Sequence, residues 1–380
     1  MQTVFSFATA TEIRFGRGVA REAVSDLAAL HPRVLLVTGG TPSRSDWLRE
    51  ALIDAGAEVA RFAVPGEPDV STIEAGVATA RDHSAGAVIA LGGGAVIDAG
   101  KAIAALVPAP RPMLDHLEVV GLGLPLEATP LPFAALPTTS GTGAEVTRNA
   151  VISVPEARRK VSLRDRTMLP RLAIVDPSLT DHCPRAITLA SGLDAVTQVI
   201  EPYISSRANP LTDALCRDAI PKGLAALIRL MEGEDPDARD ALAWTSLCGG
   251  LALANAGLGV VHGLAGPLGG LSGAAHGAIC GTLLPAGLIT NAARTEGAAA
   301  AKIGEVRQMI AGALSVPDDD AFDALRDWSR NSGLPGLDGL SITEANRNEA
   351  AEMAASSSSM KANPVPLDAE SLRVMMNAAR

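Results

Sequence analysis

Two histidines, His262 and His276, stand fourteen residues apart in the stretch HGLAGPLGGLSGAAHG, which is otherwise made of Gly, Ala, Leu, Pro and Ser. They are two of only six histidines in the chain. A neutral imidazole can bind a transition metal through one ring nitrogen, and the neighbouring side chains offer these rings almost no other polar partner. Each could instead be a hydrogen-bonded core histidine, so the pair indicates a metal site without requiring one.

A second pair of candidate ligands, Asp194 and Gln198, lies in ASGLDAVTQVIEPYIS. Their four-residue spacing puts both on one face of a predicted helix. One carboxylate oxygen, one amide oxygen and two imidazole nitrogens form a set that a divalent cation accepts, with iron or zinc favoured by the imidazoles. The alternative interpretation of Asp194 and Gln198 is an exposed polar face of the helix.

A run of three glycines, Gly92, Gly93 and Gly94, follows a predicted strand at 86–94 and precedes a predicted helix at 96–106. Glycines let the backbone approach a pyrophosphate, and a helix N-terminus supplies N–H donors and the positive end of a dipole. Ala95 and Asp98 belong to the same candidate site. A purely structural turn, with Asp98 favouring the helix dipole, is the alternative.

The loop LPTTSGTGAEVT offers the hydroxyl groups of Thr138, Thr139, Ser140 and Thr142 after another predicted strand at 131–139. These groups can donate hydrogen bonds to phosphate or ribose. Two such loops at the carboxyl ends of parallel strands are where an α/β sheet binds a nucleotide. A turn-rich connection without a ligand is the alternative.

In the first half of the chain, predicted strands alternate with predicted helices, and these elements position the two loops. Apolar, β-branched runs predict strands at 33–40, 58–64, 86–94 and 131–139, and helical spacing predicts helices at 45–56, 69–85 and 96–106. Such alternation indicates a parallel sheet with helices on both faces. Beyond residue 180, helices are expected at 187–205, 210–231, 237–257 and 319–333, and strand signals largely vanish.

The predicted fold is therefore α/β plus all-α. We expect a Rossmann-like dinucleotide-binding domain over residues 1–182 and an all-helical metal and substrate domain over 183–380, meeting at a cleft.

Composition excludes several classes of partner. A net charge of −10 and an aromatic content of 3% disfavour nucleic acid and anionic membranes. Four cysteines without a CxxC pair indicate neither a structural zinc site nor a disulfide framework, and we expect buried small residues there. The start MQTVFSFATATEIRFG lacks the features of a signal peptide, so we expect a cytoplasmic protein.

Several of these motifs, taken together and in order, resemble the iron-containing alcohol dehydrogenases of the dehydroquinate synthase-like superfamily. The similar segments include LGGGAVIDAGKAIA, LPTTSGTGAEVT, DPSLT, GLDAVTQVIEPYISSRANPLTD, LANAGLGVVHGLAGPLGG and AAHGAICGTLLP. The resemblance implies a nicotinamide cofactor, a divalent metal and a homo-oligomer, for which we expect a dimer. It places the family's four metal ligands on Asp194, Gln198, His262 and His276, and implies that Asp194 and both histidines are catalytic. Lys160 matches a family lysine near the cofactor ribose, although an ordinary exposed charge is the alternative.

Two positions depart from the family pattern. Gln198 stands where the family usually has a histidine, and Gly266 stands where it usually has a second histidine, four residues after His262. An amide is a weaker, neutral ligand, so zinc, another ion or a weakly held ion become alternatives to iron. The missing imidazole at Gly266 means that another group or water must relay a proton.

The choice of nicotinamide depends on the end of the first strand. The family often has an aspartate there, which excludes a 2′-phosphate, whereas this chain has Gly39 and Gly40 followed by Ser43 and Arg44. We therefore expect NADP(H), with NAD(H) as the alternative.

The resulting prediction is a metal-associated NAD(P)-dependent alcohol dehydrogenase or aldehyde reductase, with hydride passing between the nicotinamide and a small alcohol or aldehyde. A maleylacetate reductase-like enzyme, a glycerol dehydrogenase and a non-catalytic metabolite-binding protein are the alternatives. Gln198 and Gly266 are the only residues that favour the non-catalytic protein.

Overall fold

The computed structural model describes residues 4–354 and 359–380. Its contacts divide the chain into two compact units. The α/β unit comprises Thr9–Thr139 and Gly143–Asp181, and the helical unit comprises His182–Arg380, Ser140–Thr142 and the segment that ends at Ala8. A parallel sheet followed by a helical region confirms the predicted fold class.

The α/β unit contains a six-stranded parallel sheet in the order β1-β8-β5-β4-β2-β3. Its strands are β1 (Glu12–Phe15), β2 (Arg33–Gly39), β3 (Glu58–Val64), β4 (Ala87–Gly92), β5 (Phe133–Pro137) and β8 (Leu172–Val175). From β2 the chain passes outward to β3 and then returns to place β4 on the other side of β2. The carboxyl ends of β2 and β4 therefore flank a topological switch point, where open α/β sheets bind their ligands.

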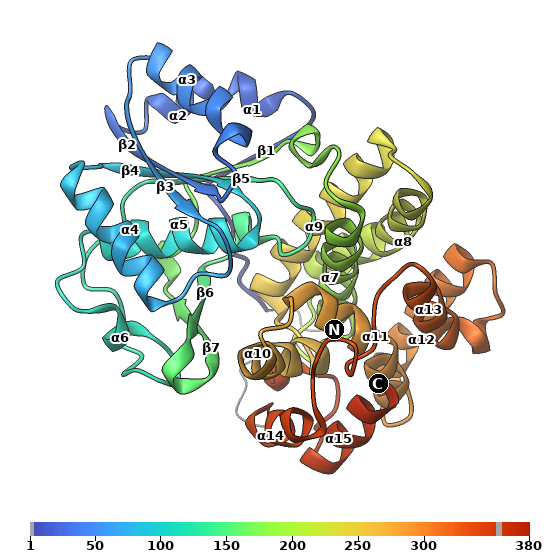
Figure 1. Cartoon of the computed structure of the whole chain (residues 1–380). Helices are drawn as coiled ribbons and strands as arrows, with labels where there is room; N and C mark the ends of the chain where they lie inside the picture. The colour runs from blue at the N-terminus through green and yellow to red at the C-terminus, as the bar shows by residue number, and fades with distance from the viewer. Residues whose placement is uncertain (1–3, 355–358) are drawn as a thin grey trace. The chain divides into compact units, whose positions relative to one another are not determined.

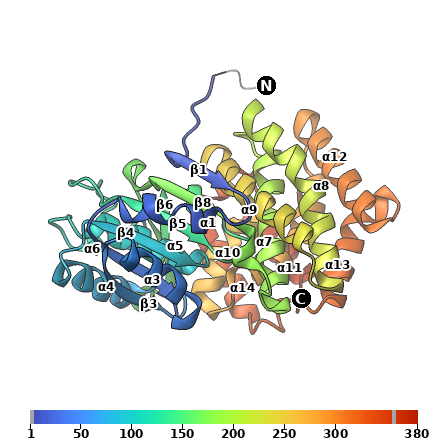
Figure 2. The ribbon, with the colours of Figure 1, turned by 90° about the horizontal axis from the view of Figure 1, so that it is seen from above.

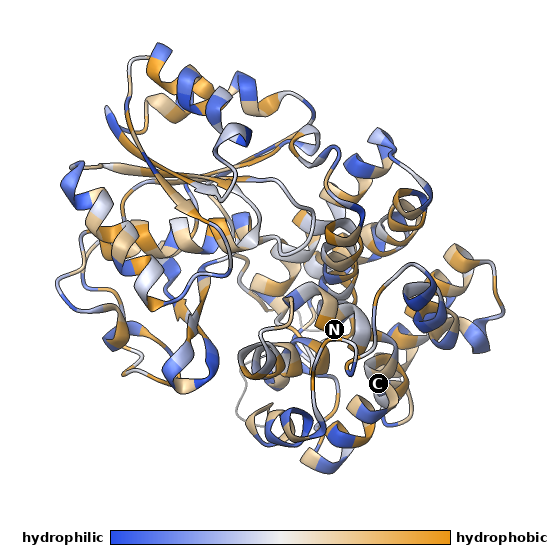
Figure 3. Ribbon diagram, viewed as in Figure 1, coloured by the Kyte–Doolittle hydropathy of each residue, from blue (hydrophilic) through white to orange (hydrophobic). Residues whose placement is uncertain are grey.

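Helices cover both faces of this sheet (Figure 1). They are α1 (Val19–Glu22), α2 (Val24–Ala28), α3 (Asp46–Asp54), α4 (Val70–Asp82), α5 (Gly94–Leu106) and α6 (Met113–His116). Along β2, Val34 and Leu36 pack in the core beneath α1–α3, whereas Leu35 and Val37 pack in the core beneath α4 and α5. Burial on both faces explains the continuous apolar run of this strand, and Figure 3 shows the sheet as hydrophobic along most of its length.

The sequence did not predict β1, β8 or the antiparallel hairpin of β6 (Asn149–Val154) and β7 (Arg159–Arg164). Arg158, with a φ of 51°, occupies the left-handed region where the hairpin turns. Short 3-10 helices are η1 (Pro42–Arg44), η2 (Ala144–Val146), η3 (Pro155–Ala157), η4 (Arg166–Met168), η5 (Pro177–Thr180), η6 (Asp318–Asp320) and η7 (Met360–Ala362).

The helical unit is built around α7, α8 and α9, which lie side by side (Figures 1 and 2). Its helices are α7 (Arg185–Ile204), α8 (Pro210–Glu232), α9 (Pro236–Ala256), α10 (Val260–Ser272), α11 (His276–Ala292), α12 (Gly297–Leu314), α13 (Ala321–Asn331), α14 (Glu344–Ala354) and α15 (Ala369–Ala378). The prediction found α7, α8, α9 and α13. It missed α10, α11, α12, α14 and α15. The many glycines of α10 and α11 weaken their helical signal.

No single helix in the described part of the chain is long and apolar enough to span a membrane. The pair α9 and α10, bent by 99°, meets the length and composition criteria only when taken together.

Candidate functional site

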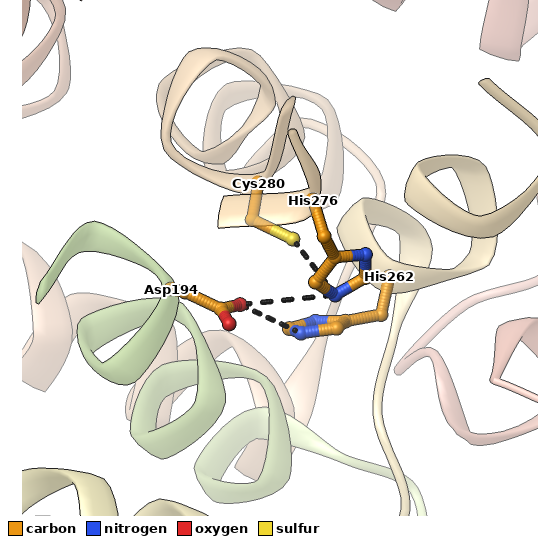
Figure 4. Close-up of side chains that lie close together, drawn as sticks. All are labelled: Asp194, His262, His276 and Cys280. Atoms are coloured by element: carbon orange, nitrogen blue, oxygen red, sulfur yellow. Dashed lines mark hydrogen bonds and ion pairs between the residues drawn. The ribbon is translucent and has the colours of Figure 1, made fainter. Parts of the chain in front are cut away.

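Three helices of the helical unit bring Asp194, His262 and His276 together (Figure 4). Asp194 lies in the middle of α7, His262 in the first turn of α10, and His276 at the start of α11. The Oδ1 atom of Asp194 is 3.3 Å from Nε2 of His262 and 3.9 Å from Nε2 of His276. The site thus joins residues that the sequence separates widely.

Close packing of α11 on α7 makes this convergence possible. A Cβ atom added to Gly277 would lie 2.5 Å from the carbonyl oxygen of Ala190 and 3.3 Å from Cβ of Asp194. Any larger residue at 277 would therefore push the start of α11 away from α7. The glycine holds His276, its neighbour, beside Asp194.

Glu201, which the sequence analysis did not select, fixes the orientation of His262. Its Oε2 atom lies 2.6 Å from Nδ1 of His262, and its Oε1 atom accepts a 2.7 Å hydrogen bond from the backbone N–H of Val261. A carboxylate can only accept, so Nδ1 carries the proton and Nε2 of a neutral His262 presents its lone pair. The spacing Asp194–Gln198–Glu201 on one helical face could have revealed this residue.

Two buried acceptor atoms consequently face each other. Asp194 is 1% exposed and His262 is 7% exposed, and neither Oδ1 of Asp194 nor Nε2 of His262 has a hydrogen-bond partner among the residues that the structure describes. Facing lone pairs in a buried site require a cation or a proton between them. The donor set, with a second carboxylate behind the imidazole, fits a divalent metal.

The pKa shifts describe the same electrostatic arrangement. Burial by itself raises the pKa of Asp194, but the nearby His262 and His276 outweigh it and the pKa is lowered. Burial opposes protonation of the histidines, yet the Cys280 sulfur and Asp194 raise the pKa of His262 well above its ordinary value and that of His276 to about 9. The cluster attracts positive charge, and protons compete with a metal for its nitrogen atoms.

Cys280 also joins this cluster, although the sequence analysis treated it as a buried small residue. It is fully buried, and its Sγ atom is 3.6 Å from Nε2 of His276, one helical turn earlier on α11. The predicted ligand Gln198 is buried one turn after Asp194, and its Nε2 donates a 2.9 Å hydrogen bond to the carbonyl oxygen of Gly141. Among the other cysteines, Cys216 and Cys248 are buried as expected, but Cys183 is only partly buried.

The glycine turn and the threonine loop lie side by side in the α/β unit. Gly92 pairs with Pro137 across β4 and β5, and the N–H of Thr138 donates to the carbonyl oxygen of Gly92 at 3.0 Å. Gly93 caps α5 and is followed by Gly94 and Ala95 in its first turn, all three partly exposed. A Cβ atom added to Gly93 would lie 3.2 Å from Oγ1 of Thr139. Free N–H groups at the start of α5 and the threonine hydroxyls therefore share one edge of the sheet.

Asp98 and Lys160 have protein partners within the α/β unit. Asp98 accepts a 3.0 Å hydrogen bond from the N–H of Val151, and Lys160, whose side chain is 8% exposed, forms a 2.7 Å ion pair with Glu67. Lys160 is therefore not an ordinary exposed charge. Ser140 and Thr142 belong to the compact helical unit, unlike Thr138 and Thr139.

Gly39 ends β2 and Gly40 follows it, so both lie at the switch point, next to the end of β4. Among the residues that the structure describes, none has an atom within 4 Å of a Cβ atom added to Gly39. Ser43 and Arg44 are exposed on η1, directly after these glycines, and no acidic side chain in the described part of the chain pairs with Arg44. An exposed hydroxyl and an unpaired guanidinium can receive an anionic group.

Comparison with known proteins gives matches over nearly the whole chain. The family profile described as iron-containing alcohol dehydrogenase matches residues 10–177, and the profile of the C-terminal region of the Fe-containing alcohol dehydrogenase family matches residues 188–380. The 1,3-propanediol dehydrogenase of Klebsiella pneumoniae is 34% identical over 82% of this chain and 81% of its own. The NAD-dependent methanol dehydrogenase of Bacillus methanolicus is 32% identical over 84% of this chain and 85% of its own. A crystal structure of 1,3-propanediol oxidoreductase superposes with a TM-score of 0.89 at 29% identity, covering 99% of this chain and 100% of that one.

Proposed function

Because the chain belongs to the iron-containing alcohol dehydrogenase family, we propose a division of its reaction between two sets of residues, one in each compact unit. The chain is an oxidoreductase that acts on CH–OH groups, interconverting small alcohols and aldehydes with NAD(P)(H). The family implies a nicotinamide cofactor and a divalent metal. The proposal assigns residues to the metal ion and to the nicotinamide cofactor, and it names the nicotinamide.

Asp194, His262 and His276 hold the divalent ion in the helical unit. The observation that carries this assignment is the approach of two buried atoms, Oδ1 of Asp194 and Nε2 of His262, which lie 3.3 Å apart and make no hydrogen bond within the described part of the chain. A divalent ion supplies Lewis acidity that polarises the substrate oxygen and lowers the proton affinity of an alcohol. Asp194 contributes an anionic ligand, and Glu201 holds the imidazole of His262 in the tautomer that presents Nε2. The His276 side chain, 33% exposed, leaves one side of the cluster accessible.

The α/β unit binds the nicotinamide cofactor at the carboxyl ends of β2, β4 and β5. Gly92, Gly93 and Gly94 admit the pyrophosphate to the N-terminus of α5, and Thr138 and Thr139 donate hydrogen bonds beside it. The alcohol loses a hydride from carbon to the nicotinamide and a proton from oxygen, and the reverse steps reduce an aldehyde.

The proton leaves without the imidazole that the family usually has at position 266. No atom of residues 4–354 or 359–380 lies within 4 Å of a Cβ atom added to Gly266, which leaves room for water beside it. Water in this space, rather than a second histidine on α10, relays the proton.

The nicotinamide is NADP(H). Gly39 presents no carboxylate to repel a 2′-phosphate, and Ser43 and Arg44 lie exposed immediately after it. NAD(H) is the competing choice, since one relative is named an NAD-dependent methanol dehydrogenase.

A cofactor-coupled screen tests the proposal. Small primary alcohols are offered with NAD+ or NADP+, and their aldehydes with the reduced cofactors, before and after exhaustive chelation and after restoring a divalent ion. We expect chelation, His262→Ala or His276→Ala to abolish turnover, whereas the control His83→Ala at the end of α4 should not. Full turnover after chelation would show that Asp194 and the histidines act as hydrogen-bonding or proton-transfer groups without a metal.

A further inference from the structure

The cluster of side chains around Asp194 contains a fourth potential metal ligand, Cys280, which differs from the ligand expected at Gln198. Asp194, His262, His276 and Cys280 each offer one ligand atom, and the four atoms lie within 4.8 Å of one another. Figure 4 shows the four side chains converging from three helices. Cys280 shares α11 with His276, one turn away, so both project toward Asp194 from the same helical face.

Three of the distances between these atoms are close to those of a tetrahedral zinc site. With Zn–N and Zn–O bonds of about 2.0 Å and a Zn–S bond of about 2.3 Å, the edges of the tetrahedron are about 3.3 Å between N or O atoms and about 3.5 Å to sulfur. The observed separations are 3.3 Å from Asp194 to His262, 3.9 Å from Asp194 to His276, and 3.6 Å from Cys280 to His276. All four atoms lie within 4.8 Å of one another, so the side chains would have to draw together by at most about 1.5 Å to enclose an ion.

We propose that Cys280 is a thiolate ligand of the metal ion, in the set Asp194, His262, His276 and Cys280, and that it makes the site select zinc over iron. Soft thiolate ligands favour zinc, and a given ligand set generally binds Zn2+ more tightly than Fe2+. On binding, the thiol releases its proton to solvent. This inference rests on the metal site of the proposed function, but not on the reaction or the cofactor.

Gln198 then has a positioning role. Its amide donates to the carbonyl oxygen of Gly141, whose added Cβ atom would lie 2.9 Å from Cβ of Ser191. The amide therefore fastens the Ser140–Thr142 segment to α7. The amide oxygen, which this hydrogen bond does not use, is a neutral and weak metal ligand, whereas the buried sulfur already contacts a ligand nitrogen.

The thiolate changes the charge of the site. Asp194 and Cys280 together carry two negative charges, which balance a divalent cation, whereas one carboxylate with neutral ligands leaves a net positive charge. The ion should accordingly polarise a substrate oxygen less strongly. Since all four tetrahedral positions are filled by protein, the substrate would join as a fifth ligand.

Cobalt substitution tests the ligand directly. The chelator-treated full-length protein is loaded with Co2+, and the thiolate-to-cobalt charge-transfer absorption in the near ultraviolet is recorded beside the metal content. We expect the band in the wild type, in Gln198→Ala and in Cys248→Ser, the matched control for a buried cysteine on α9. We expect its loss in Cys280→Ser, together with a fall in zinc affinity beyond the about 10–100-fold that loss of an outer hydrogen-bonding partner costs.

A competition experiment tests the selectivity. With equal concentrations of Zn2+ and Fe2+ under anaerobic conditions, the wild type should retain zinc, and Cys280→Ser should lower the ratio of zinc to iron. Thermal unfolding of the metal-free Cys280→Ser and Cys280→Ala proteins in chelator shows whether each variant folds as the metal-free wild type does.

Three results overturn the inference: a wild type that binds Co2+ without the band, a wild type that binds no divalent ion, or a folded Cys280→Ser that keeps the band. Nicotinamide-dependent turnover is measured on the same preparations. Turnover without the band overturns this inference alone, whereas the band without any turnover overturns the proposed reaction alone.

Discussion

The Nδ1 atom of His262 lies 2.6 Å from the Oε2 atom of Glu201, both side chains being buried between α7 and α10. This carboxylate behind the imidazole makes His262 a stronger metal ligand and holds its ring in place. Replacing it by the isosteric amide keeps an acceptor for Nδ1–H but removes the negative charge and the hydrogen bond from the N–H of Val261.

Glu201→Gln should therefore lower metal affinity by about 10–100-fold while leaving the fold intact. Titration of the metal-free protein with Zn2+ in competition with a chelator measures this change. Glu305→Gln is the control. Glu305 also accepts a hydrogen bond from a side chain of α7, the hydroxyl of Tyr203, but it lies away from the cluster. Equal affinities in the wild type and Glu201→Gln would remove Glu201 from the site.

Gly93→Val tests the cofactor site in the α/β unit. The new side chain starts 3.2 Å from Oγ1 of Thr139 and extends over the first N–H groups of α5, where we place the pyrophosphate. We expect NAD(P)H binding, followed by fluorescence titration, to be abolished with little change in circular dichroism. Gly304→Val, at a helix position with open space, is the control. An unchanged titration would move the pyrophosphate elsewhere.

Gly39→Asp tests the choice of nicotinamide. The site has room for the side chain, so the fold should tolerate it. A carboxylate there repels a 2′-phosphate and accepts a hydrogen bond from a 2′-hydroxyl, so NADPH binding should weaken by at least tenfold relative to NADH, or about 1.4 kcal/mol. Dissociation constants for both cofactors provide the measurement. A wild type that already prefers NADH tenfold would show the proposal of NADP(H) to be wrong.

Gln198→His places a third imidazole on the face of α7 that carries Asp194. Imidazole binds iron better than an amide does, so iron occupancy should rise, and it should rise further in the double variant with Cys280→Ser. Elemental analysis after purification without chelator measures occupancy. Gln308→His on α12, remote from the cluster, controls for the added histidine. Identical metal contents in all these proteins would place residue 198 outside the coordination sphere.

The Glu234–Arg239 pair predicts a pH-dependent contribution to stability. Glu234 accepts hydrogen bonds of 2.9 and 2.7 Å from the buried guanidinium of Arg239, which lowers the pKa of Glu234 from 4.5 to about 2. A lowered pKa means that the stabilisation is complete above pH 4.5 and is lost as the pH falls through about 2.

Glu234→Gln should therefore cost about 1 kcal/mol at neutral pH, allowing for solvent screening, and progressively less in acid. The difference in Tm from the wild type, followed across this range, checks the prediction, with the exposed Glu232→Gln as the control. A Tm difference that does not change with pH would contradict it.

The sequence predicted those helices and strands in which apolar residues recur with a clear helical or strand period. The buried run of β2 and the acidic start of α4, where Asp69 caps the helix, were read correctly. The four-residue strands β1 and β8 were missed because they are too short to show a period. Helices α10 and α11 were missed because packing against α7, not helix propensity, stabilises their glycine-rich sequences.

That the two histidines and Asp194 lie together could be predicted, because few residue types bind metals and these segments resemble a known family. Cys280 could not, since its place beside His276 and Asp194 depends on how α11 packs on α7. Glu201 was missed, although its spacing from Asp194 and Gln198 on one face of α7 indicates it. The ion pair of Lys160 could not be predicted, since its partner Glu67 is distant in sequence. The chemistry of a side chain can thus be predicted from the sequence, but the residue that it contacts on another helix or strand cannot.

The pairing of β1 with β8 also constrains how the chain is assembled. Glu12–Phe15 precedes its partner Leu172–Val175 by some 160 residues in the chain, so it leaves the ribosome well before that partner does. Strands β2 to β5 can form a sheet during that interval, while β1 has no neighbour in it. During translation the N-terminal segment must stay unpaired until β8 leaves the ribosome, so completion of the α/β unit is a late, non-local event.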